Sequence, residues 1–394
     1  MVSFDVDRVL ADMTLEEKCL LLSGRDNWHT VAFPHHGVPS IRVSDGPNGV
    51  RGTKFFDAVP AASFPCGTAL GATFDRHLLF SAGQLMAKEA KAKGVHAILG
   101  PTINIQRSPL GGRGFESFSE DPVLSGLCAA AIVNGMQSLG IQSTIKHFVC
   151  NDQEDGRMFY NAFVTERALR EIYLMAFQIA MRDSSPASVM TAYNKLNGVH
   201  VSQSVHLLEE VLRKEWNWDG LAMSDWTGVF TTKESIIAGL DLEMPGPPKW
   251  RGKLLEGSVS SKELPLRYVD NATRRTLRFI KKCIEESGVP ENASEESRNT
   301  PDCVSLLRKL SADSIVVLKN ETNVLPLDKN RTTAVIGPNS KVTAYCGGGS
   351  ASLTPYYTVS PYEGIEKKVT SKPRFSLGVA TFKELPLTWR TVNR

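Results

Sequence analysis

The chain of 394 residues is 42% hydrophobic and 22% charged, and its formal net charge is +3. These are ordinary values for a globular protein, and the length predicts about two domains. The sequence has no basic stripe interleaved with aromatic residues, and no apolar run approaches the roughly 20 residues of a membrane span. We therefore expect neither nucleic acid nor a membrane as a partner.

The N-terminal residues and the cysteines bear on the cellular compartment. The N-terminus has no basic n-region and no apolar h-region, so no signal peptide is visible and an intracellular location is expected. Seven cysteines without CxxC spacing are typical of buried thiols in a reducing compartment. No zinc site is expected from them, and no other metal or cofactor is indicated.

The first element expected along the chain is a helix. Thr14 and Glu17 form the pattern of a capping box, and the leucines at 20–22 continue an apolar face behind it. A second helix is predicted over residues 165–182, where apolar residues recur at helical spacing and charged residues occupy the opposite face.

Short apolar segments that end at a polar residue or at a proline are predicted to be strands. They are residues 40–46, 96–101, 144–149, 188–194, 220–225 and 238–245. Because they alternate with longer helical segments, the pattern predicts βαβ units around a parallel sheet. Polar groups at the tips of successive strands favour a barrel with one shared mouth.

Asp225 is the first candidate for chemistry. The apolar run that begins at Gly220 stops at this carboxylate, as if a buried strand delivered it at its C-terminal end. Ligands bind at that end of the strands in parallel α/β folds. Taken alone, the pattern is equally consistent with an aspartate that caps the following helix.

Other polar residues near the predicted strand ends also allow structural interpretations. Lys146 is consistent with a side chain that snorkels out at the strand end, and His147 with a hydrogen-bonded core histidine. Met190 alone indicates core packing, and Asp45 alone a turn. The glycine-rich segments lack phosphate-loop spacing and are predicted to be tight turns near the mouth; they are residues 111–114 and 347–349. The loop residues Glu116, Ser117 and Glu120 are expected to be solvated.

A domain boundary is expected at residues 285–301, which are polar and rich in turn formers. The first domain would comprise residues 1–284 and the second would begin over residues 302–369. Within the second, residues 304–310 are predicted to be helical, and residues 314–319 and 333–338 to be strands. Residues 370–394 lack a clear alternation of strand and helix, so an atypical tail is expected there.

Several long motifs, in order, resemble those of family 3 glycoside hydrolases, most closely of the fungal β-glucosidase type. In the first domain they are residues 44–51, 100–117, 146–154, 189–194 and 223–226. In the second they are residues 317–321, 325–327, 336–338 and 347–351. The likeness covers residues 5–368, and the tail departs from it. The second domain therefore resembles a truncated version of the family's.

The resemblance implies a (β/α)8-type, TIM-like barrel followed by an incomplete α/β sandwich, with sugar bound between them. It implies that Asp225 is the catalytic nucleophile and that Trp226 is a platform for the sugar or the aglycone. It also implies a set of residues that line the glucose subsite: Asp45, Arg107, Lys146, His147, Met190 and Tyr193. Many relatives are secreted, so secretion is the alternative to an intracellular location.

The residue types suit this chemistry. A retaining glycosidase needs an ionised carboxylate as nucleophile and a second carboxyl group about 5–5.5 Å away to protonate the leaving oxygen. Asp45 can accept hydrogen bonds from sugar hydroxyls, and Arg107 and Lys146 can donate charge-assisted ones. Such cations also favour the ionised form of neighbouring aspartates. Tyr193 would either donate to the nucleophile or pack on the sugar ring.

The residues after His147 distinguish branches of the family. The N-acetylglucosaminidase branch resembles a pattern with a histidine-containing acid loop, which is absent here, so the β-glucosidase branch is favoured. In that branch the acid/base glutamate lies far downstream in the second domain, so it is expected to lie beyond residue 394 and not in this chain. The expected function is a retaining β-glucosidase that acts on terminal non-reducing β-glucosyl residues of small glucosides.

The sequence leaves two other functions to consider. The main alternative is a truncated, catalytically impaired fragment that binds glucosides. A phosphate-binding barrel enzyme such as an aldolase is disfavoured, because no Schiff-base lysine with a phosphate loop can be assembled.

Overall fold

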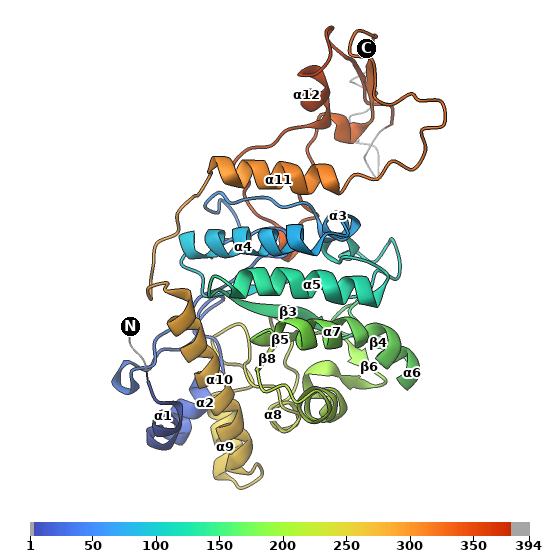
Figure 1. The fold of residues 1–394 in the computed structure, drawn as a ribbon. Helices are drawn as coiled ribbons and strands as arrows, with labels where there is room; N and C mark the ends of the chain where they lie inside the picture. The colour runs from blue at the N-terminus through green and yellow to red at the C-terminus, as the bar shows by residue number, and fades with distance from the viewer. Residues whose placement is uncertain (1–3, 380–394) are drawn as a thin grey trace, which may run out of the picture. The chain divides into compact units, whose positions relative to one another are not determined.

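The computed structural model describes residues 4–379 of the chain. The chain divides into two compact units, which are coloured by residue number in Figure 1. The first unit runs to Ile315 and also includes Cys346–Thr354, whereas the second comprises Val316–Tyr345 and the residues that follow from Pro355. The division therefore falls after residue 315, and whether the family's domain boundary lies at 285–301 stays a prediction.

A parallel sheet of five strands forms the centre of the first unit, as the sequence predicts. In spatial order the strands are β1 (Val43–Asp45), β2 (Ala97–Leu99), β3 (Gln142–Phe148), β5 (Ser188–Thr191) and β8 (Leu221–Ser224). Every residue of these strands is buried. Strands covered on both faces are expected to be continuous apolar runs, and these segments are largely of that kind.

Backbone pairing continues past β8 through isolated bridges. Leu242, from the predicted strand 238–245, pairs with Met223, and the next residue, Glu243, pairs with Ser23. The chain from residue 24 then turns back on itself, and His29 pairs with Arg42, directly before β1. The pairing thus returns to the first strand of the sheet, although residues 238–245 form no regular strand of their own.

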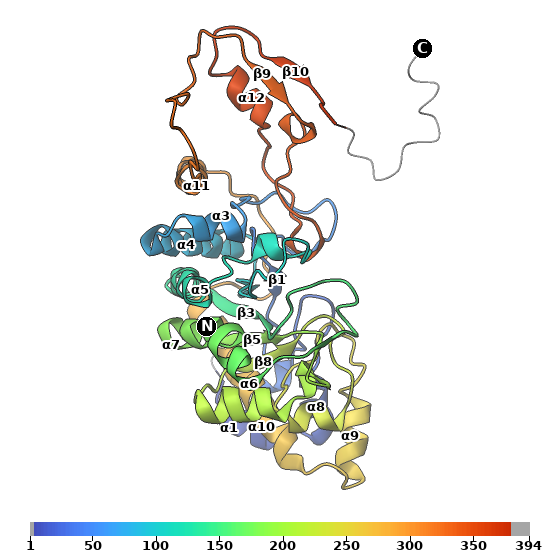
Figure 2. The same ribbon diagram turned by 90° about the vertical axis from the view of Figure 1, so that its right-hand side faces the viewer.

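Helices cover the sheet and connect its strands. Successive helices α4, α5 and α7 pack against one another, and Figures 1 and 2 show them side by side along the sheet. The helices of the first unit are α1 (Val6–Asp12), α2 (Leu15–Leu21), α3 (Gly67–Ala72), α4 (Arg76–Ala92), α5 (Pro122–Gln137), α6 (Glu166–Ala168), α7 (Met175–Ser184), α8 (Lys233–Ile237), α9 (Lys253–Ser260), α10 (Leu266–Ser287) and α11 (Pro301–Asp313). Short 3₁₀ helices occur at η1 (Pro34–His36), η2 (Gly114–Glu116) and η4 (Val201–Gln203). π-Helices occur at η3 (Leu169–Tyr173) and η5 (His206–Glu215).

The predicted helices are present, with two differences in extent. The capping box of Thr14 and Glu17 opens α2 as expected. The helix predicted over 165–182 is interrupted, because the π-helical turn η3 separates α6 from α7. The helix predicted at 304–310 is α11, which packs on α3 and α4 and so belongs to the first unit.

Glycines allow α4 and α5 to approach closely. A Cβ atom on Gly83 would lie 2.2 Å from the carbonyl oxygen of Ile132, and one on Gly135 would lie 2.1 Å from that of Phe80. Real Cβ atoms do not come so near to backbone. The two helices can therefore pack at this separation only because both positions lack a side chain.

The second unit contains one pair of short strands. β9 (Ala334–Ile336), within the predicted strand 333–338, runs parallel to β10 (Arg374–Ser376). The helix α12 (Pro361–Glu366) packs by the Tyr362 ring, which lies edge-on to Phe375 at 6.2 Å. The predicted strand at 314–319 is not formed, and Val316–Leu318 are exposed.

The residues expected to form an atypical tail are described in part. β10 lies within 370–394, so this segment contributes a strand that its sequence did not suggest. Residues 380–394 lie outside the described residues.

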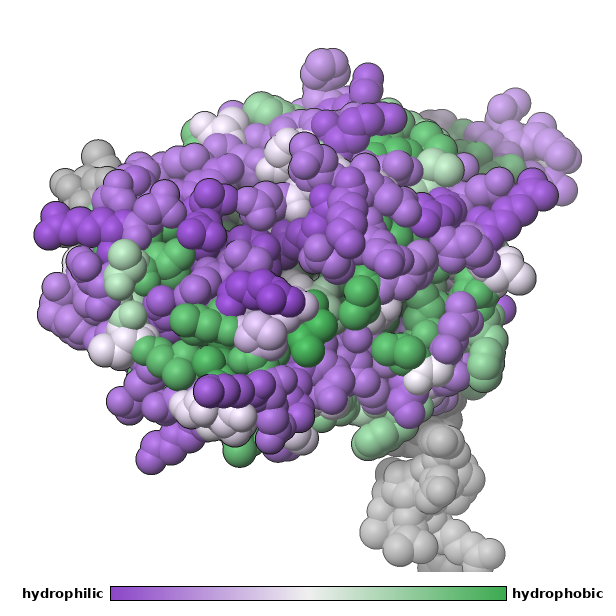
Figure 3. All heavy atoms as spheres, turned by 90° about the horizontal axis from the view of Figure 1, so that it is seen from below, coloured by the Kyte–Doolittle hydropathy of each residue, from purple (hydrophilic) through white to green (hydrophobic). Residues whose placement is uncertain are grey.

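The surface of the first unit is mixed. The face in Figure 3 carries mainly hydrophilic side chains around several apolar areas, which is normal for a folded protein. Among the described residues, no helix is both long and apolar enough to cross a bilayer.

A second, short sheet of the first unit has three strands: β4 (Asn161–Ala162), β6 (Lys195–Leu196) and β7 (Val199–His200).

A buried carboxylate anchors the chain segment beside β8. Asp241 is fully buried; it accepts hydrogen bonds from Arg213 (2.9 Å) and Arg275 (2.8 Å) and from the backbone N–H of Ala222. Removing one partner of a buried ion pair lowers the stability by far more than the pair contributes to it, because the remaining charge is left buried without a partner.

We predict that Asp241→Ala lowers the free energy of unfolding by about 3–5 kcal/mol, measured by urea denaturation. Asp219→Ala is the matched control, because Asp219 pairs with Arg278 (2.6 Å) and lies 3.9 Å from Arg275, but its side chain is 60% exposed. That change should cost less than about 1 kcal/mol. Equal losses in the two variants would contradict the special role of the buried carboxylate.

Candidate functional site

The polar residues at the carboxyl edge of the sheet form one cluster. Asp45 ends β1, Lys146 and His147 lie in β3, and Asp225 directly follows β8. All four side chains are buried. Because the strands are parallel, their carboxyl ends meet at one edge, and side chains from distant parts of the sequence come together there.

Asp45 is held between two cations. Lys146 Nζ lies 3.2 Å from Oδ1, and Arg51 Nη2 lies 2.5 Å from Oδ2. Asp45 is thus part of a buried ionic network and not a simple turn residue. The sequence analysis missed Arg51, which lies inside the quoted motif 44–51. Its position six residues after Asp45, past the turn, was the available signal.

His147 is fixed in orientation and in protonation. Asn104 Oδ1 accepts the backbone N–H of His147 at 2.9 Å and lies 3.2 Å from Nδ1 of the His147 ring. Arg113 Nη1 lies 3.0 Å from Nε2 of the same ring. Burial and the charges of Arg113 and Lys146 hold the pKa of His147 well below its usual range. The guanidinium can only donate, so Nε2 accepts and the proton of the neutral ring belongs on Nδ1.

Asp225 has one carboxylate oxygen with no committed partner. Oδ1 accepts the backbone N–H of Trp226 at 2.7 Å. Oδ2 is buried, accepts no hydrogen bond from the described residues, and lies 3.6 Å from His147 Nε2. Burial raises the pKa of Asp225, and the positive charges of Arg113 and Lys146 oppose this rise. The carboxylate is thus desolvated, with Oδ2 not committed to a hydrogen bond at this position.

The helix-cap interpretation of Asp225 is wrong. No helix begins after it until α8, whose N-cap residue is Thr232. Asp225 therefore does not serve the helical backbone.

Trp226 lies at one end of a row of three aromatic side chains. Its half-buried ring lies 5.6 Å from the ring of Trp28, which in turn lies 5.2 Å from Phe55. The guanidinium of Arg51 lies over both Trp28 (5.1 Å) and Phe55 (4.7 Å). These contacts link the aromatic side chains to the Asp45 network through one cation.

Tyr193 and Met190 have supporting positions. The Tyr193 hydroxyl donates to the backbone carbonyl of Trp226 at 2.9 Å, and its ring lies under the guanidinium of Arg157 at 4.6 Å. Burial, together with the charge of Asp225, raises the pKa of Tyr193. Met190 is buried in the apolar core cluster, next to Met223 across the sheet.

Arg107 does not join the cluster. Its side chain is 67% exposed, and the carboxylate it approaches, that of Asp152, is 3.9 Å away. The arginine in the site is Arg113, which contacts His147 and whose charge acts on Asp225. Both arginines lie in the same quoted motif, in a loop without periodicity, so sequence spacing did not distinguish them.

Glu116 is also different from the expectation. The expected solvated loop acid is only 3% exposed and receives both Arg113 Nε (2.7 Å) and Nη2 (2.8 Å). Thr102 adds a hydrogen bond at 3.1 Å. The 3₁₀ turn η2 brings Glu116 back over Arg113, three residues earlier, and this i, i+3 spacing was the signal available in the sequence.

Residues that follow the expected linker contact the segments around Arg113 and Ala61. Ser350 accepts a hydrogen bond from Arg113 Nη2 at 3.0 Å, and the backbone carbonyl of Thr354 accepts the N–H of Ala61 at 2.8 Å. A Cβ atom on Gly347 would lie 2.2 Å from the ring of Phe115. The backbone of the second glycine-rich segment therefore lies against Phe115, and whether this turn borders a barrel mouth stays a prediction.

A small hollow lies beside Arg113 and His147, and Asn104, Arg107 and Asp152 also line it. Burial raises the pKa of Asp152 to about 6. Among residues 4–379, only one group of three or more acidic, histidine or cysteine side chains is close enough together to hold a metal ion. That group contains no residue of this site. The site therefore has the residues for acid–base and hydrogen-bond chemistry on a polar ligand.

Comparison with known proteins places this arrangement in a family. The model of the glycosyl hydrolase family 3 N-terminal domain matches residues 35–279. The chain belongs to glycosyl hydrolase family 3. The family's C-terminal domain matches residues 315–387, so the likeness extends beyond residue 368, where the sequence analysis ended it.

Curated relatives in this family are fungal proteins named probable β-glucosidase I. That of Neosartorya fischeri is 55% identical over 387 residues, which is 98% of this chain and 46% of the relative. That of Aspergillus niger is 58% identical over 362 residues, or 92% of this chain and 44% of the relative. The chain spans about half the length of the curated relatives it matches.

Solved structures of family members have the same fold. The β-glucosidase of Kluyveromyces marxianus in complex with glucose has a TM-score of 0.94 and 52% identity, over 97% of this chain and 47% of that one. β-Glucosidase 3B of Thermotoga neapolitana in complex with glucose has a TM-score of 0.86 and 35% identity, over 94% of this chain and 55% of that one.

We predict that Glu116→Ala lowers the free energy of unfolding by about 3–5 kcal/mol, because it leaves the Arg113 guanidinium without its carboxylate. Glu120→Ala is the matched control, an exposed acid in the same loop, and should change stability by no more than about 0.5 kcal/mol. Urea denaturation of both variants checks this. A Glu116 variant as stable as the control would mean that the Arg113 pair is not a buried one in solution.

Proposed function

We propose that this chain carries the nucleophile and the glucose-recognition residues of a retaining β-glucosidase, which releases terminal non-reducing β-D-glucosyl residues from small glucosides. One observation carries the proposal: the buried Oδ2 of Asp225 has no hydrogen-bond partner among the described residues. It lies at the carboxyl edge of a parallel sheet, beside buried cations. The names of the relatives and the glucose in two solved neighbours support the substrate class.

In the proposed reaction Asp225 attacks the anomeric carbon. Oδ2 would form a bond to that carbon while the glycosidic oxygen leaves with its bonding electrons and takes a proton from a general acid. Water would then attack the same carbon and free the carboxylate. The charges of Arg113 and Lys146 favour the ionised nucleophile, and the general acid is assigned to no residue of this chain.

Glucose recognition is proposed for the residues around the nucleophile. Asp45 has lone pairs beyond those that meet Lys146 and Arg51, and can accept sugar hydroxyls. Lys146 and Arg113 have N–H groups left to donate, and the His147 ring is held where it can contact the ligand. Trp226, backed by Trp28, offers an aromatic face. We propose Arg113 in the place first given to Arg107, and core packing for Met190.

We also infer that the first unit is a barrel of the (β/α)8 type. The support is the backbone pairing that leaves β8, passes through residues 242–243 and 23–30, and returns to β1. The second unit would then be the beginning of an α/β sandwich. Both inferences go beyond the open parallel sheet described above.

A second function is a glucoside-binding fragment without turnover. It is favoured by the general acid, which is assigned to none of the described residues, whereas the nucleophile and the recognition residues are assigned. The two functions differ in one step, since only the enzyme forms and releases a covalent glycosyl intermediate.

We predict that a 2-fluoro-glucoside with a good leaving group labels Asp225, seen by mass spectrometry of the peptides. Asp225→Asn should abolish labelling, because the amide is no nucleophile. Asp152→Asn, which changes a buried carboxyl of the neighbouring hollow, should leave it intact. Burial raises the pKa of Asp225, so the labelling rate should fall on acidification at a higher pH than for an ordinary aspartate. A label on another residue refutes the assignment, and binding without labelling favours the fragment.

We predict that Asp45→Ala weakens glucose binding by roughly 10- to 150-fold, since a hydrogen bond to a charged group contributes about 1.5–3 kcal/mol. Isothermal titration calorimetry measures this. Arg107→Ala is the control and should bind glucose like the parent chain, because that side chain is 67% exposed and pairs with Asp152, at the edge of the hollow. A loss in the Arg107 variant as large as that in the Asp45 variant would restore Arg107 to the subsite.

A further inference from the structure

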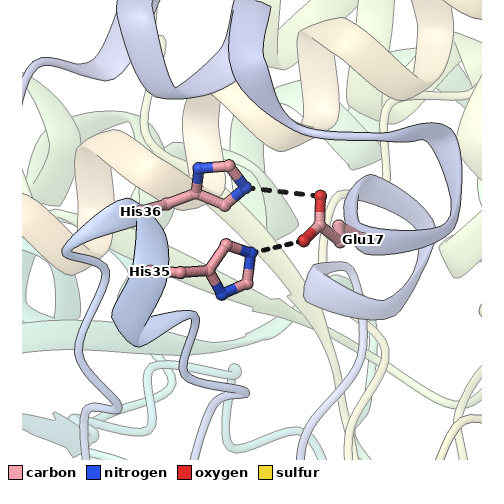
Figure 4. Close-up of side chains that lie close together, drawn as sticks. All are labelled: Glu17, His35 and His36. Atoms are coloured by element: carbon pink, nitrogen blue, oxygen red, sulfur yellow. Dashed lines mark hydrogen bonds and ion pairs between the residues drawn. The ribbon is translucent and has the colours of Figure 1, made fainter.

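Two adjacent histidines face one carboxylate away from the proposed active site. Figure 4 shows His35 and His36, from η1, pointing toward Glu17 of α2. His35 Nε2 lies 2.6 Å from Glu17 Oε1, and His36 Nε2 lies 3.3 Å from Oε2. The possible ligand atoms of the three residues all lie within 4.8 Å of one another.

Backbone hydrogen bonds hold the turn that carries the two histidines. η1 begins at Pro34, and Gly37 ends it in a left-handed conformation with φ 71°. Backbone hydrogen bonds between Phe33 and Val38 run in both directions, at 2.8 and 3.1 Å, and close the turn. This turn directs both imidazole rings to one side, with their centroids 4.2 Å apart.

Glu17 is held from the other side. It occupies the third position of α2, and its Oε2 accepts the backbone N–H of Thr14 at 2.8 Å and the Thr14 hydroxyl at 3.0 Å. The capping box therefore fixes the carboxylate through Oε2, which also faces His36, and leaves Oε1 directed at His35. Two imidazole nitrogens and one carboxylate oxygen are thus presented by two short, separately anchored segments.

We propose that Glu17, His35 and His36 form a binding site for a divalent transition-metal ion of the zinc type. The ligands would be Nε2 of each histidine and Oε1 of Glu17, with water in the remaining position. Imidazole nitrogen and carboxylate oxygen are usual zinc ligands, in tetrahedral arrangements with three protein ligands and an open position. The His35 side chain is 61% exposed, so a hydrated ion can reach the site from solvent.

The spacing of the ligand atoms suits this ion after small side-chain rotations. Bonds of about 2.0–2.2 Å to a tetrahedral ion place ligand atoms a little over 3 Å apart. His36 Nε2 already lies 3.3 Å from Glu17 Oε2, whereas His35 Nε2 and Oε1, now 2.6 Å apart, would have to separate to admit the ion. The ion would replace the hydrogen bonds of both histidines to Glu17 and tie η1 to the start of α2.

The surface of the chain offers a matched comparison. His206 contacts the carboxylates of Glu166 (3.4 Å) and Glu210 (3.2 Å), so it also combines imidazole and carboxylate groups in solvent. It has only one imidazole, and these residues do not form a metal-holding group among the described ones. This arrangement should bind zinc no better than an ordinary surface.

The test is titration of the chelator-treated chain with Zn²⁺ alone, by isothermal titration calorimetry. We expect saturable binding of one ion per chain. His35→Asn, His36→Asn and Glu17→Gln should each weaken it by at least about tenfold, because loss of even an outer-shell partner costs 10–100-fold. Glutamine can keep the capping box, so the Glu17 variant should remain folded. His206→Asn should bind like the parent chain.

A second measurement separates this site from thiols. Cys66 and Cys346 are partly exposed and could bind zinc, so the titration is repeated with both changed to serine. Unchanged affinity in the serine variant, together with loss in the histidine variants, supports the site. The proposal is overturned if the parent chain shows no saturable binding. It is also overturned if the His35 and His36 variants bind Zn²⁺ as tightly as the parent chain, or if only the serine variant loses binding.

Discussion

The ammonium group of Lys146 lies inside a fully buried strand, and the carboxylate of Asp45 compensates its charge there. Much of the candidate site follows from this pair. Arg51 meets the second oxygen of Asp45, and Arg51 also packs on the aromatic rings that lead to Trp226. A buried ion without a partner would cost several kcal/mol, so each charge at this edge needs an opposite one nearby.

The same balance extends across the site. The acidic groups of Asp45, Glu116 and Asp225 are accompanied by the basic groups of Arg51, Lys146 and Arg113. Asp45 and Glu116 accept from cations directly, whereas Asp225 feels the charges without a direct bond. That difference separates residues that hold the site together from the residue left available to a ligand. His147, kept neutral, adds a hydrogen-bonding surface without adding charge.

Sequence reasoning predicted the parallel sheet and the residues that strand ends deliver, because apolar runs mark the strands and the next polar residue marks the edge. Asp45, Lys146, His147 and Asp225 were found in this way and through the family motifs. The inward positions of Arg51, Arg113 and Glu116 were not predicted, and Arg107, which was predicted for the subsite, has an exposed side chain. These residues lie in loops, where no periodicity tells which side chain turns inward. The apolar run at 314–319 was predicted to be a strand, but an apolar run becomes a strand only beside a pairing partner.

The first unit is discontinuous in sequence, because Cys346–Thr354 packs with residues that precede Ile315. Ser350 bonds to Arg113 and Thr354 to Ala61, across more than two hundred residues of chain. Domains fold as units during synthesis, from the N-terminus onward. On the ribosome, the strands and helices of this unit can therefore assemble well before its last segment exists. The contacts of Arg113 with this segment can form only after the segment has been synthesised. The nascent chain would therefore have its sheet for some time before the candidate site is complete.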